Sequence, residues 1–336
     1  MSAGNPPAIA ALPADGAPQP RLSVMIPAYE PGPFLVEALR GILAQDPGQS
    51  VMQIAIVDDA SPTVDVAALV AAVAPAGRIE IHRNPTNLGL AGNWNRGITL
   101  ARGEFVHLLH QDDLILPGFY ERLLHGFAGD SQVGMAFSRH AFIDETGQWT
   151  RRSHRERWRR GMLARWLGRI SERQRIQCPA AIVRRSVYER LGGFRSDLTY
   201  ALDWEMWVRI AAAYRVWYEP QILACYRRHG LSETTRLGRA GSIGTDTLQA
   251  IHIFSQYLPA QSRERLGNRA YQRMVHVQLR AARKLLAQRN AASAGEQLEI
   301  ARTGLNRLPA GLGRALRDRQ LRSMERRCAA SEPSRD

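Results

Sequence analysis

The fold of this chain is decided by a stretch that reads MQIAIVDDA over residues 52–60. The first six of these residues are largely apolar, which is typical of a strand buried on both faces, and two aspartates follow directly. Similar apolar runs occur on either side: LSVMIP over residues 22–27 and EFVHLL over residues 104–109. Near-continuous apolar strands favour a buried, mostly parallel sheet, so the stretch predicts an α/β protein.

Helical segments separate the predicted strands. In residues 34–44, helical spacing places Leu35, Leu39, Ile42 and Leu43 on one face. The same reasoning predicts three further helices and one further strand, at residues 64–73, 90–101 and 117–127 and at residues 79–82. Alternating strands and helices indicate right-handed βαβ units, whose ligands bind at the carboxyl ends of the strands.

Acidic pairs follow two of these strands. Asp58 and Asp59 end the second strand, and Asp112 and Asp113 follow the fourth. Neighbouring carboxylates repel each other unless a positive group lies close by, and divalent cations prefer oxygen ligands and substrate phosphates. We interpret the two pairs as a nucleotide and metal site. The alternative, that Asp58 or Asp112 only caps the turn that follows it, stays open.

The composition limits the possible partners. The 336 residues include 45 basic and 31 acidic ones, a net charge of +14, and Lys284 is the one lysine. This excess favours phosphate-bearing partners, although an arginine-rich source proteome would also account for it. A hydrophobic content of 45% excludes disorder of the whole chain. Three scattered cysteines do not form a disulfide framework or a zinc cluster, which indicates a reducing compartment.

Taken in order, the motifs of the chain resemble the family 2 glycosyltransferases of GT-A fold. The matching stretches are residues 24–29 (VMIPAY), 56–63 (IVDDASPT), 87–89 (NLG), 95–98 (NRGI), 101–105 (ARGEF), 109–118 (LHQDDLILPG), 191–194 (LGGF), 202–209 (LDWEMWVR) and 226–229 (YRRH). The resemblance implies a Rossmann-like, mostly parallel sheet flanked by helices. It also implies inverting transfer of a sugar from a nucleotide-diphosphate sugar to a hydroxyl acceptor, in bacterial surface polysaccharide or glycolipid synthesis.

The resemblance also implies roles for individual residues. Asp203 is the catalytic base, and Asp113 ligates Mn²⁺ or Mg²⁺, with Asp112 and His229 beside it. The implied nucleotide-binding residues are Pro27, Ala28, Tyr29, Glu30, Asp58, Asp59, Asn87, Gly89, Asn95 and Asp112. Asp203 also begins a predicted helix, whose dipole favours an ionised carboxylate. Two alternatives stay open: Asp203 as an N-cap and His229 as a surface or capping histidine.

Four positions depart from the family pattern. They are Glu30, where Asn is frequent, Trp94, where a basic residue often lies near the diphosphate, His110, at the first acidic position of the metal motif, and Leu202, beside the base. A non-catalytic nucleotide-sugar binder would account for the departures at Glu30, Trp94 and His110 and stays an alternative. A nucleotidyltransferase is the other, although residues 27–32 supply no glycine-rich phosphate loop.

Two further classes are disfavoured. An oxidoreductase would need G-x-G-x-x-G after the first strand, and that motif is absent. A nucleic-acid-binding protein would leave the acidic strand ends unexplained.

We expect the chain to consist of several parts. Residues 1–20, rich in Ala, Pro and Gly, form a disordered lead rather than a secretory signal, and residues 329–336 a disordered tail. Residues 21–237 form the catalytic domain, with a nucleotide-binding half (21–115) and an acceptor half (116–237). A basic helical extension covers residues 238–328. No stretch has the roughly 18–20 apolar residues of a membrane helix, so we expect a cytoplasmic protein. The resemblance implies a glycan or lipid-linked acceptor.

An arginine cluster stands apart from these motifs. Residues 151–160 read RRSHRERWRR, with Trp158 among six arginines. Arginine suits bidentate contacts to phosphate, which favours a lipid diphosphate, an anionic glycan or peripheral contact with an anionic membrane. Nucleic acid and a solvated, mobile loop are the alternatives.

Overall fold

The computed structural model describes residues 4–13, 19–230, 235–237 and 242–329. The contacts within the chain divide it into two compact units. The first comprises Met1–Trp166 and Arg175–His229, and the second comprises Leu167–Gln174 and Gly230–Asp336.

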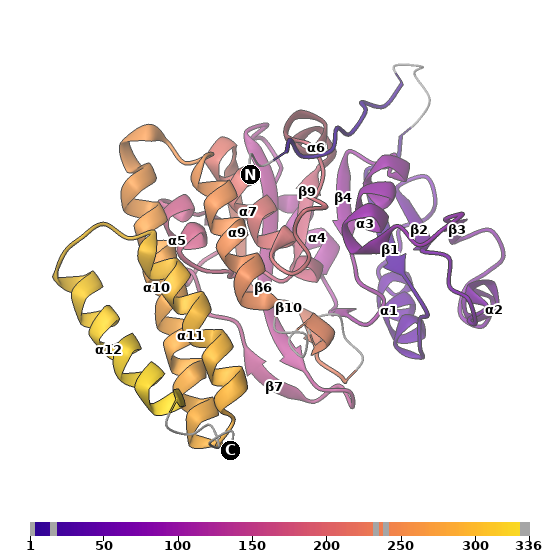
Figure 1. Ribbon diagram of the computed structural model, residues 1–336. Coiled ribbons are helices and arrows are strands. Elements are labelled where there is room, and N and C mark those ends of the chain that lie inside the picture. The colour runs from indigo at the N-terminus through magenta and orange to yellow at the C-terminus, as the bar shows by residue number, and fades with distance from the viewer. Residues whose placement is uncertain (1–3, 14–18, 231–234, 238–241, 330–336) are drawn as a thin grey trace. The chain divides into compact units, whose positions relative to one another are not determined.

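The first unit carries the sheet and the helices between its strands (Figure 1). Its elements are β1 (Leu22–Ala28), α1 (Phe34–Leu43), β2 (Met52–Asp58), α2 (Val66–Ala71), β3 (Glu80–Arg83), α3 (Gly89–Leu100), β4 (Phe105–Leu108), β5 (Leu114–Ile115), α4 (Phe119–His125), β6 (Val133–Ile143), β7 (Trp149–Arg152), β8 (Gly161–Met162), the 3-10 helix η1 (Cys178–Ala180), β9 (Ala181–Arg184), α6 (Arg185–Leu191), α7 (Leu202–Ala213) and β10 (Arg215–Arg227).

The ten strands form one mixed sheet in the order β3-β2-β1-β4-β9-β6-β10-β5, with β7 on β6 and β8 on β10. The pairs among β1, β2, β3 and β4 are all parallel. β9 is antiparallel to both β4 and β6, while β6 and β10 are parallel. The sheet therefore joins a parallel N-terminal half to a mixed C-terminal half, and the predicted α/β class is confirmed.

Burial explains why these segments adopt this arrangement. Every residue of β2 is buried, as a strand covered by helices on both faces requires, whereas β3 at the sheet edge alternates between half-buried and exposed residues. In α1, Leu35, Leu39 and Ile42 of the predicted face are fully buried, and Leu43 is half-buried. The core is thus formed by the apolar runs that end at the acidic pairs.

The strand register places the polar strand ends on one edge of the sheet. Ala28 at the end of β1 pairs with Asp58 at the end of β2. On the other side of β1, Met25 pairs with Leu108, the last residue of β4, and the chain runs on from there to Asp112. Loops after β1, β2 and β4 therefore begin at the same edge.

Residues 4–13 differ from the expected disordered lead. The amide of Gly193 donates to the Pro7 carbonyl at 2.8 Å, and Arg185 Nη1 donates to the Ala10 carbonyl at 3.2 Å. Ile9 is 5% exposed and packs close to Gly193. An apolar side chain and backbone acceptors in a proline-rich stretch are enough to fix it on the first unit, which the low-complexity composition did not indicate. Residues 1–3, 14–18 and 330–336 of the predicted lead and tail lie outside the described residues.

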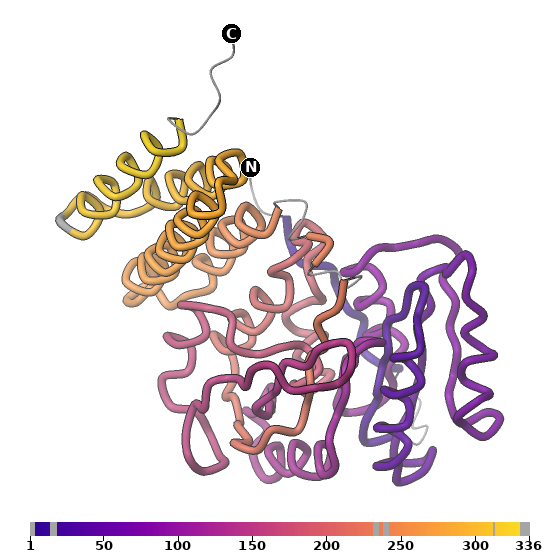
Figure 2. Tube along the Cα trace, turned by 90° about the horizontal axis from the view of Figure 1, so that it is seen from below, coloured from indigo at the N-terminus to yellow at the C-terminus, as the bar shows by residue number. Residues whose placement is uncertain are grey.

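The second unit is helical. It contains α9 (Ile243–Ser255), α10 (Ala260–Ala287), α11 (Ala291–Asn306) and α12 (Leu312–Ala329), while α5 (Trp166–Glu172) is divided between the units. Figures 1 and 2 both show α10, α11 and α12 side by side. Within the described residues, no helix is long and apolar enough to cross a membrane.

Candidate active site

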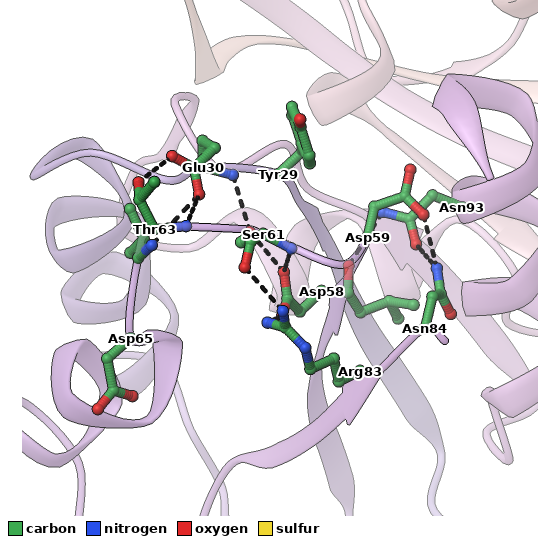
Figure 3. Close-up of polar contacts among 12 residues, drawn as sticks. Tyr29, Glu30, Asp58, Asp59, Ser61, Thr63, Asp65, Arg83, Asn84 and Asn93 are labelled. Carbon is green, nitrogen blue, oxygen red and sulfur yellow. Dashed lines mark hydrogen bonds and ion pairs between the residues drawn. The ribbon is translucent and has the colours of Figure 1, made fainter. Parts of the chain in front are cut away.

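The loop after β1 is organised by Glu30, whose backbone φ of 45° lies in the left-handed region. Its amide donates to Ser61 Oγ at 2.9 Å, and its carboxylate accepts from the amides of Thr63 at 2.9 Å and Val64 at 3.2 Å (Figure 3). A hydrogen bond from the Thr63 hydroxyl is the main reason why the pKa of Glu30 is lowered. Glu30 therefore ties the β1 loop to the β2 loop through contacts with protein groups.

Asp58, the last residue of β2, is 1% exposed. Its Oδ1 accepts from the amide of Ser61 at 3.1 Å and from Ser61 Oγ at 2.5 Å. Its Oδ2 pairs with the Arg83 guanidinium, which also donates to the Ser61 carbonyl at 2.7 Å (Figure 3). Both carboxylate oxygens of Asp58 are thus satisfied by the turn that follows it and by β3.

Asp59 is also turned inward, with 3% exposure. Its Oδ1 accepts from Asn84 Nδ2 and from the Leu88 amide, both at 2.8 Å, and its Oδ2 accepts from the Gly89 amide at 3.0 Å. The first amides of a helix have no partner within it. The Asp59 carboxylate, which follows β2, accepts from these amides at the start of α3. Asn87 Oδ1 adds a further 3.0 Å contact to the Gly89 amide.

The second acidic pair has a different environment. Asp112 Oδ2 lies 2.9 Å from His229 Nε2, and this hydrogen bond raises the pKa of His229. Asp113 is fully buried, and its Oδ1 accepts from the Arg227 amide at 2.8 Å. Its Oδ2 makes no hydrogen bond within the described residues, although His110 Nδ1 lies 3.1 Å away. Burial and the neighbouring Asp112 carboxylate raise the pKa of Asp113.

Arg227 holds this second pair in place. Its side chain is 1% exposed and donates from Nε to the Asp112 carbonyl at 2.9 Å and from Nη2 to Glu37 Oε2 at 2.7 Å. Its guanidinium carbon lies 4.1 Å from the centroid of the Phe34 ring. The end of β10 therefore joins α1 to the loop that follows β4.

Two of the departures from the family pattern contact each other. The rings of Trp94 and His110 are stacked, with centroids 4.8 Å apart and an interplanar angle of 27°. Trp94 also meets Phe194 edge to face at 4.9 Å. Burial opposes charge on His110, but its contacts with Cys178 and Asp113 outweigh that effect and raise the pKa of the imidazole well above its usual value. A half-buried imidazole thus lies between an indole and a carboxylate.

Asp203 lies in the first turn of α7, whose N-cap is Ala201. The alternative that Asp203 is the N-cap is therefore wrong. Its Oδ1 accepts from the Trp204 amide at 2.6 Å, and the side chain is half-buried. The carboxylates of both Asp203 and Asp113 raise the pKa of the buried Cys178 thiol, after the larger effect of burial, so the two acids act on one thiol. Leu202, the other departure, is buried.

Further hydrogen bonds connect some of the predicted nucleotide-binding residues and set Asn95 apart from them. Tyr29 is 47% exposed, and its backbone exchanges two hydrogen bonds with the Gln111 side chain, at 2.9 and 3.1 Å. This joins the β1 loop to the residue before Asp112. Asn95 instead binds both backbone groups of Phe194 at 2.7 Å, through Nδ2 and Oδ1 of its side chain. Pro27 and Ala28 lie in β1, paired with Val57 and Asp58.

The donor set after β4 fits a divalent cation. His110, Asp112 and Asp113 each offer one ligand atom, and these atoms lie within 4.8 Å of one another. Asp113 Oδ2 is buried and makes no hydrogen bond within the described residues, and its nearest charged neighbour is His110 Nδ1 at 3.1 Å. Two carboxylate oxygens and an imidazole nitrogen are ligands that Mn²⁺ accepts, and Mg²⁺ favours the oxygens. The four oxygens of Asp58 and Asp59, in contrast, already accept hydrogen bonds.

Several residues of this site were not predicted. His110 entered the sequence analysis only as a departure, and no role was expected for Cys178, Asn84 or Glu37. Asn84 forms a buried amide chain with Asp59 and Asn93, and Asn93 Nδ2 donates to the Val57 carbonyl at 2.9 Å. A histidine two residues before an acidic pair was the only sequence signal of this group.

Sequence comparison relates the chain to known proteins. The model of the family described as glycosyl transferase family 2 matches residues 23–192, just over half of the chain. An uncharacterized protein of Mycobacterium tuberculosis is 31% identical over 238 residues, which cover 65% of this chain and 70% of that protein. The succinoglycan biosynthesis protein ExoO of Rhizobium meliloti is 33% identical over 120 residues, 36% of this chain and 31% of that protein.

Solved structures show the same fold. TarS residues 1–349 of S. aureus, in complex with UDP-GlcNAc, superimposes with a TM-score of 0.65 at 16% identity and covers 94% of this chain and 93% of that one. The mannosyltransferase PcManGT of Pyrobaculum calidifontis, in complex with GDP-Man and Mn²⁺, has a TM-score of 0.55 at 19% identity, over 95% and 89% of the two chains. The predicted GT-A fold is confirmed, and the chain belongs to glycosyl transferase family 2.

Proposed function

We propose that this glycosyltransferase moves a sugar from a nucleotide-diphosphate sugar to a hydroxyl acceptor, with inversion at the anomeric carbon, in the synthesis of a surface glycan. The observation that carries the proposal is the cluster of His110, Asp112 and Asp113 after β4, with a buried carboxylate oxygen that makes no hydrogen bond within the described residues. Related proteins support the donor and the pathway class, since TarS was solved with UDP-GlcNAc and ExoO is named for succinoglycan biosynthesis.

The cluster supports metal-assisted loss of a nucleoside diphosphate. Asp112, Asp113 and His110 would hold Mn²⁺ or Mg²⁺, with His229 orienting Asp112 through its 2.9 Å contact. A cation bound there would stabilise the charge that develops on the leaving diphosphate. Arg227 keeps both aspartates in position by binding the Asp112 carbonyl and the Asp113 carboxylate.

Asp203 would act as the general base for the acceptor hydroxyl. A carboxylate in the first turn of a helix is favoured in its ionised form by the helix dipole, and an ionised carboxylate can accept a proton from an attacking hydroxyl. Because one direct displacement opposite the leaving group inverts the anomeric carbon, the product configuration reports on this role.

The test combines binding and turnover. Thermal shift with UDP, GDP and dTDP, each with and without Mn²⁺, identifies the nucleotide, because a ligand that binds only the folded state raises the melting temperature. A panel of donor sugars then identifies the substrate by nucleotide release. In Asp203→Asn, we expect release to fall about 10²–10⁴-fold while metal-dependent nucleotide binding persists.

Three results would contradict the proposal. Unchanged turnover in Asp203→Asn would show that Asp203 is not the general base. A product of retained configuration would exclude the inverting step. Nucleotide binding that needs no metal and leads to no release from any donor would favour the non-catalytic binder, which the departures at His110 and Trp94 also fit.

A further inference from the structure

An exposed surface of the first unit is basic and aromatic without a described partner. It consists of the exposed arginines and tryptophans of residues 149–160: Trp149, Arg151, Arg152, Arg155, Arg157, Trp158, Arg159 and Arg160. Trp158 is 82% exposed, the most exposed of the large hydrophobic side chains, and Trp149 is 46% exposed. We call these eight residues the Trp-Arg surface.

The only acidic residue of the segment is withdrawn from this surface. The Glu156 side chain is 3% exposed, and its Oε1 lies 2.9 Å from Arg175 Nη1. The exposed charge of residues 149–160 is therefore entirely positive. Since the net charge of the chain is also positive, this surface adds a concentrated patch to a field that already attracts anions.

The segment is held in a defined conformation. The Ser153 amide donates to the His140 carbonyl at 2.8 Å, and the His140 amide donates to Ser153 Oγ at 2.9 Å. The Glu156 amide and the Tyr218 hydroxyl lie 3.1 Å apart, and Arg157 Nη1 donates to the Met162 carbonyl at 2.8 Å. These anchors lie between and beside the exposed tryptophans. The alternative of a solvated loop without fixed structure therefore does not describe this segment.

Arginine and tryptophan are paired on the surface. The Arg155 guanidinium lies 4.3 Å from the centroid of the Trp158 ring, and that of Arg152 lies 5.4 Å from the Trp149 ring. Each pair presents an indole together with a group that binds phosphate bidentately. Indoles and arginines together suit the boundary between lipid headgroups and hydrocarbon, where the ring is apolar on one side and hydrated on the other.

A basic pocket adjoins this surface. It has a volume of about 500 Å³ and is lined by Arg21, Arg122, His125, Arg160 and Glu121, together with two apolar residues. The guanidinium groups of Arg21 and Arg160 have no partner within the described residues, and Arg122 lies 3.9 Å from Glu219. Arg160 follows Trp158 by two residues, so the pocket can receive a phosphate beside the exposed indole. Arg21 precedes β1, at the end of that strand opposite Ala28.

We propose that the Trp-Arg surface docks this protein on an anionic phospholipid membrane, with Trp149 and Trp158 in the headgroup layer and the Arg21, Arg122 and Arg160 pocket holding a lipid phosphate. A membrane is favoured over nucleic acid because single-stranded nucleic acid binds in a charged groove that covers its stacking rings. Trp158, at 82% exposure, has no such walls.

The test is flotation of the full chain with phosphatidylcholine vesicles that contain one third phosphatidylglycerol, against vesicles of phosphatidylcholine alone. We expect binding to the anionic vesicles only, weakened by salt because the phosphate contacts are electrostatic. Arg155→Gln with Arg159→Gln should weaken binding roughly 25-fold, about fivefold for each arginine removed. Trp158→Ala should weaken it roughly tenfold, through loss of the buried indole.

Matched controls distinguish the effect of this surface from the effect of net charge or of exposed apolar area elsewhere. Arg265→Gln with Arg269→Gln removes the same charge from exposed positions of α10, and Leu316→Ala removes an apolar side chain that is 67% exposed. Each control should stay within about twofold of the unaltered protein. In Trp158→Phe, binding should persist while quenching of tryptophan fluorescence by brominated lipid falls, which shows that this indole enters the lipid.

Other outcomes overturn the proposal. Equal binding to both vesicle types, equal losses in the α10 control, or unchanged quenching in Trp158→Phe would each exclude docking through this surface. Tight binding of single-stranded DNA that depends on Trp158, without vesicle binding, would assign the surface to nucleic acid. Nucleotide release from a soluble donor is measured in the same variants and should be unaffected, so failure of docking is distinct from failure of the proposed transfer.

Discussion

The two acidic pairs of the sheet edge look alike in sequence and differ in their surroundings. After β2, the four carboxylate oxygens of Asp58 and Asp59 all accept hydrogen bonds or ion pairs from the protein. After β4, Asp113 Oδ2 is buried without a hydrogen bond in the described part of the chain. The Asp112 carboxylate makes one hydrogen bond in this part of the chain, with His229. The oxygens of the first pair are occupied by protein donors, and the second pair retains capacity for a cation.

This difference shows what makes an acidic pair a candidate metal site. Repulsion between neighbouring carboxylates can be relieved by backbone amides, by a guanidinium or by a metal. At Asp58 and Asp59 the amides of α3 and the side chain of Arg83 perform this task. We therefore assign a structural role to the first pair, and its contact with a nucleotide stays a prediction.

The largest effect that would sharpen the comparison is on turnover. In Asp113→Asn, we expect transfer to fall about 10²–10³-fold, because the amide is a poor metal ligand and the leaving diphosphate loses its counter-charge. Nucleotide release measured against Mn²⁺ concentration checks this, and metal-dependent thermal stabilisation by the nucleotide should be lost. The matched control is Asp59→Asn, in which metal dependence should persist. Equal loss of metal dependence in both variants would break the comparison.

For stability, we expect the larger effect in the first acidic pair. Asp59→Ala should lower the free energy of unfolding by about 2 kcal/mol, because Asn84 Nδ2 and the amides of Leu88 and Gly89 lose their acceptor. Asp112→Ala removes one partly exposed contact, to His229, and should cost less than about 1 kcal/mol. Urea unfolding with an unchanged slope measures both values. A larger cost at Asp112 than at Asp59 would contradict the assignment.

A third prediction concerns the indole that stacks on His110. Trp94→Leu should weaken Mn²⁺ binding roughly tenfold, as loss of a neighbour that orients a ligand typically does. Trp94→Phe keeps a ring against the imidazole and should restore most of the affinity. Mn²⁺ affinity is measured by titration calorimetry, with the unfolding midpoint of each variant as a check on the core. Identical affinities in the two variants would remove His110 from the ligand set.

The smallest expected effect is a pH dependence of the folding stability, caused by His107 in β4, the strand that neighbours β1. Val24 of β1 pairs with His107 in β4 and with Ile54 in β2. Burial lowers the pKa of His107 to about 3, far below the value of about 6.5 in the unfolded chain. The unfolded state therefore binds the proton first, and stability is lost as the pH falls from about 6.5 towards about 3.

The measurement is a difference between variant and unaltered protein. From pH 7 to pH 6, the free energy of unfolding of the unaltered protein should fall by roughly 0.7 kcal/mol more than that of His107→Gln. Buried His140, whose pKa is also lowered to about 3, contributes equally to both proteins, and so does Asp113, whose raised pKa acts in the opposite direction. Parallel pH curves would show that His107 is not the source.

Much of the parallel half could be predicted because its signals are local. The apolar runs that form β1, β2 and β4 lie within one or two residues of the predicted ranges, and so do the bounds of α1 and α3. The conformation of residues 151–160 was harder to predict. Its first two arginines belong to β7, and they pair with Phe142 and Ala141 of β6, which no pattern within the segment indicates. The ordered stretch at residues 4–13 depends on contacts with Gly193 and Arg185, which no local pattern indicates.

The site divides in the same way. The sequence alone determined which acids reach the sheet edge, because the end of a buried strand fixes where the next polar residues lie. It did not show that the Asp59 oxygens are all occupied by donors while Asp113 Oδ2 makes no hydrogen bond within the described residues, or that the rings of Trp94 and His110 stack. The tertiary structure decided those outcomes. The charge state of a carboxylate, and the number of its oxygens without a hydrogen-bond donor, depend on residues such as Asn84 and Arg227 that lie far away in the sequence.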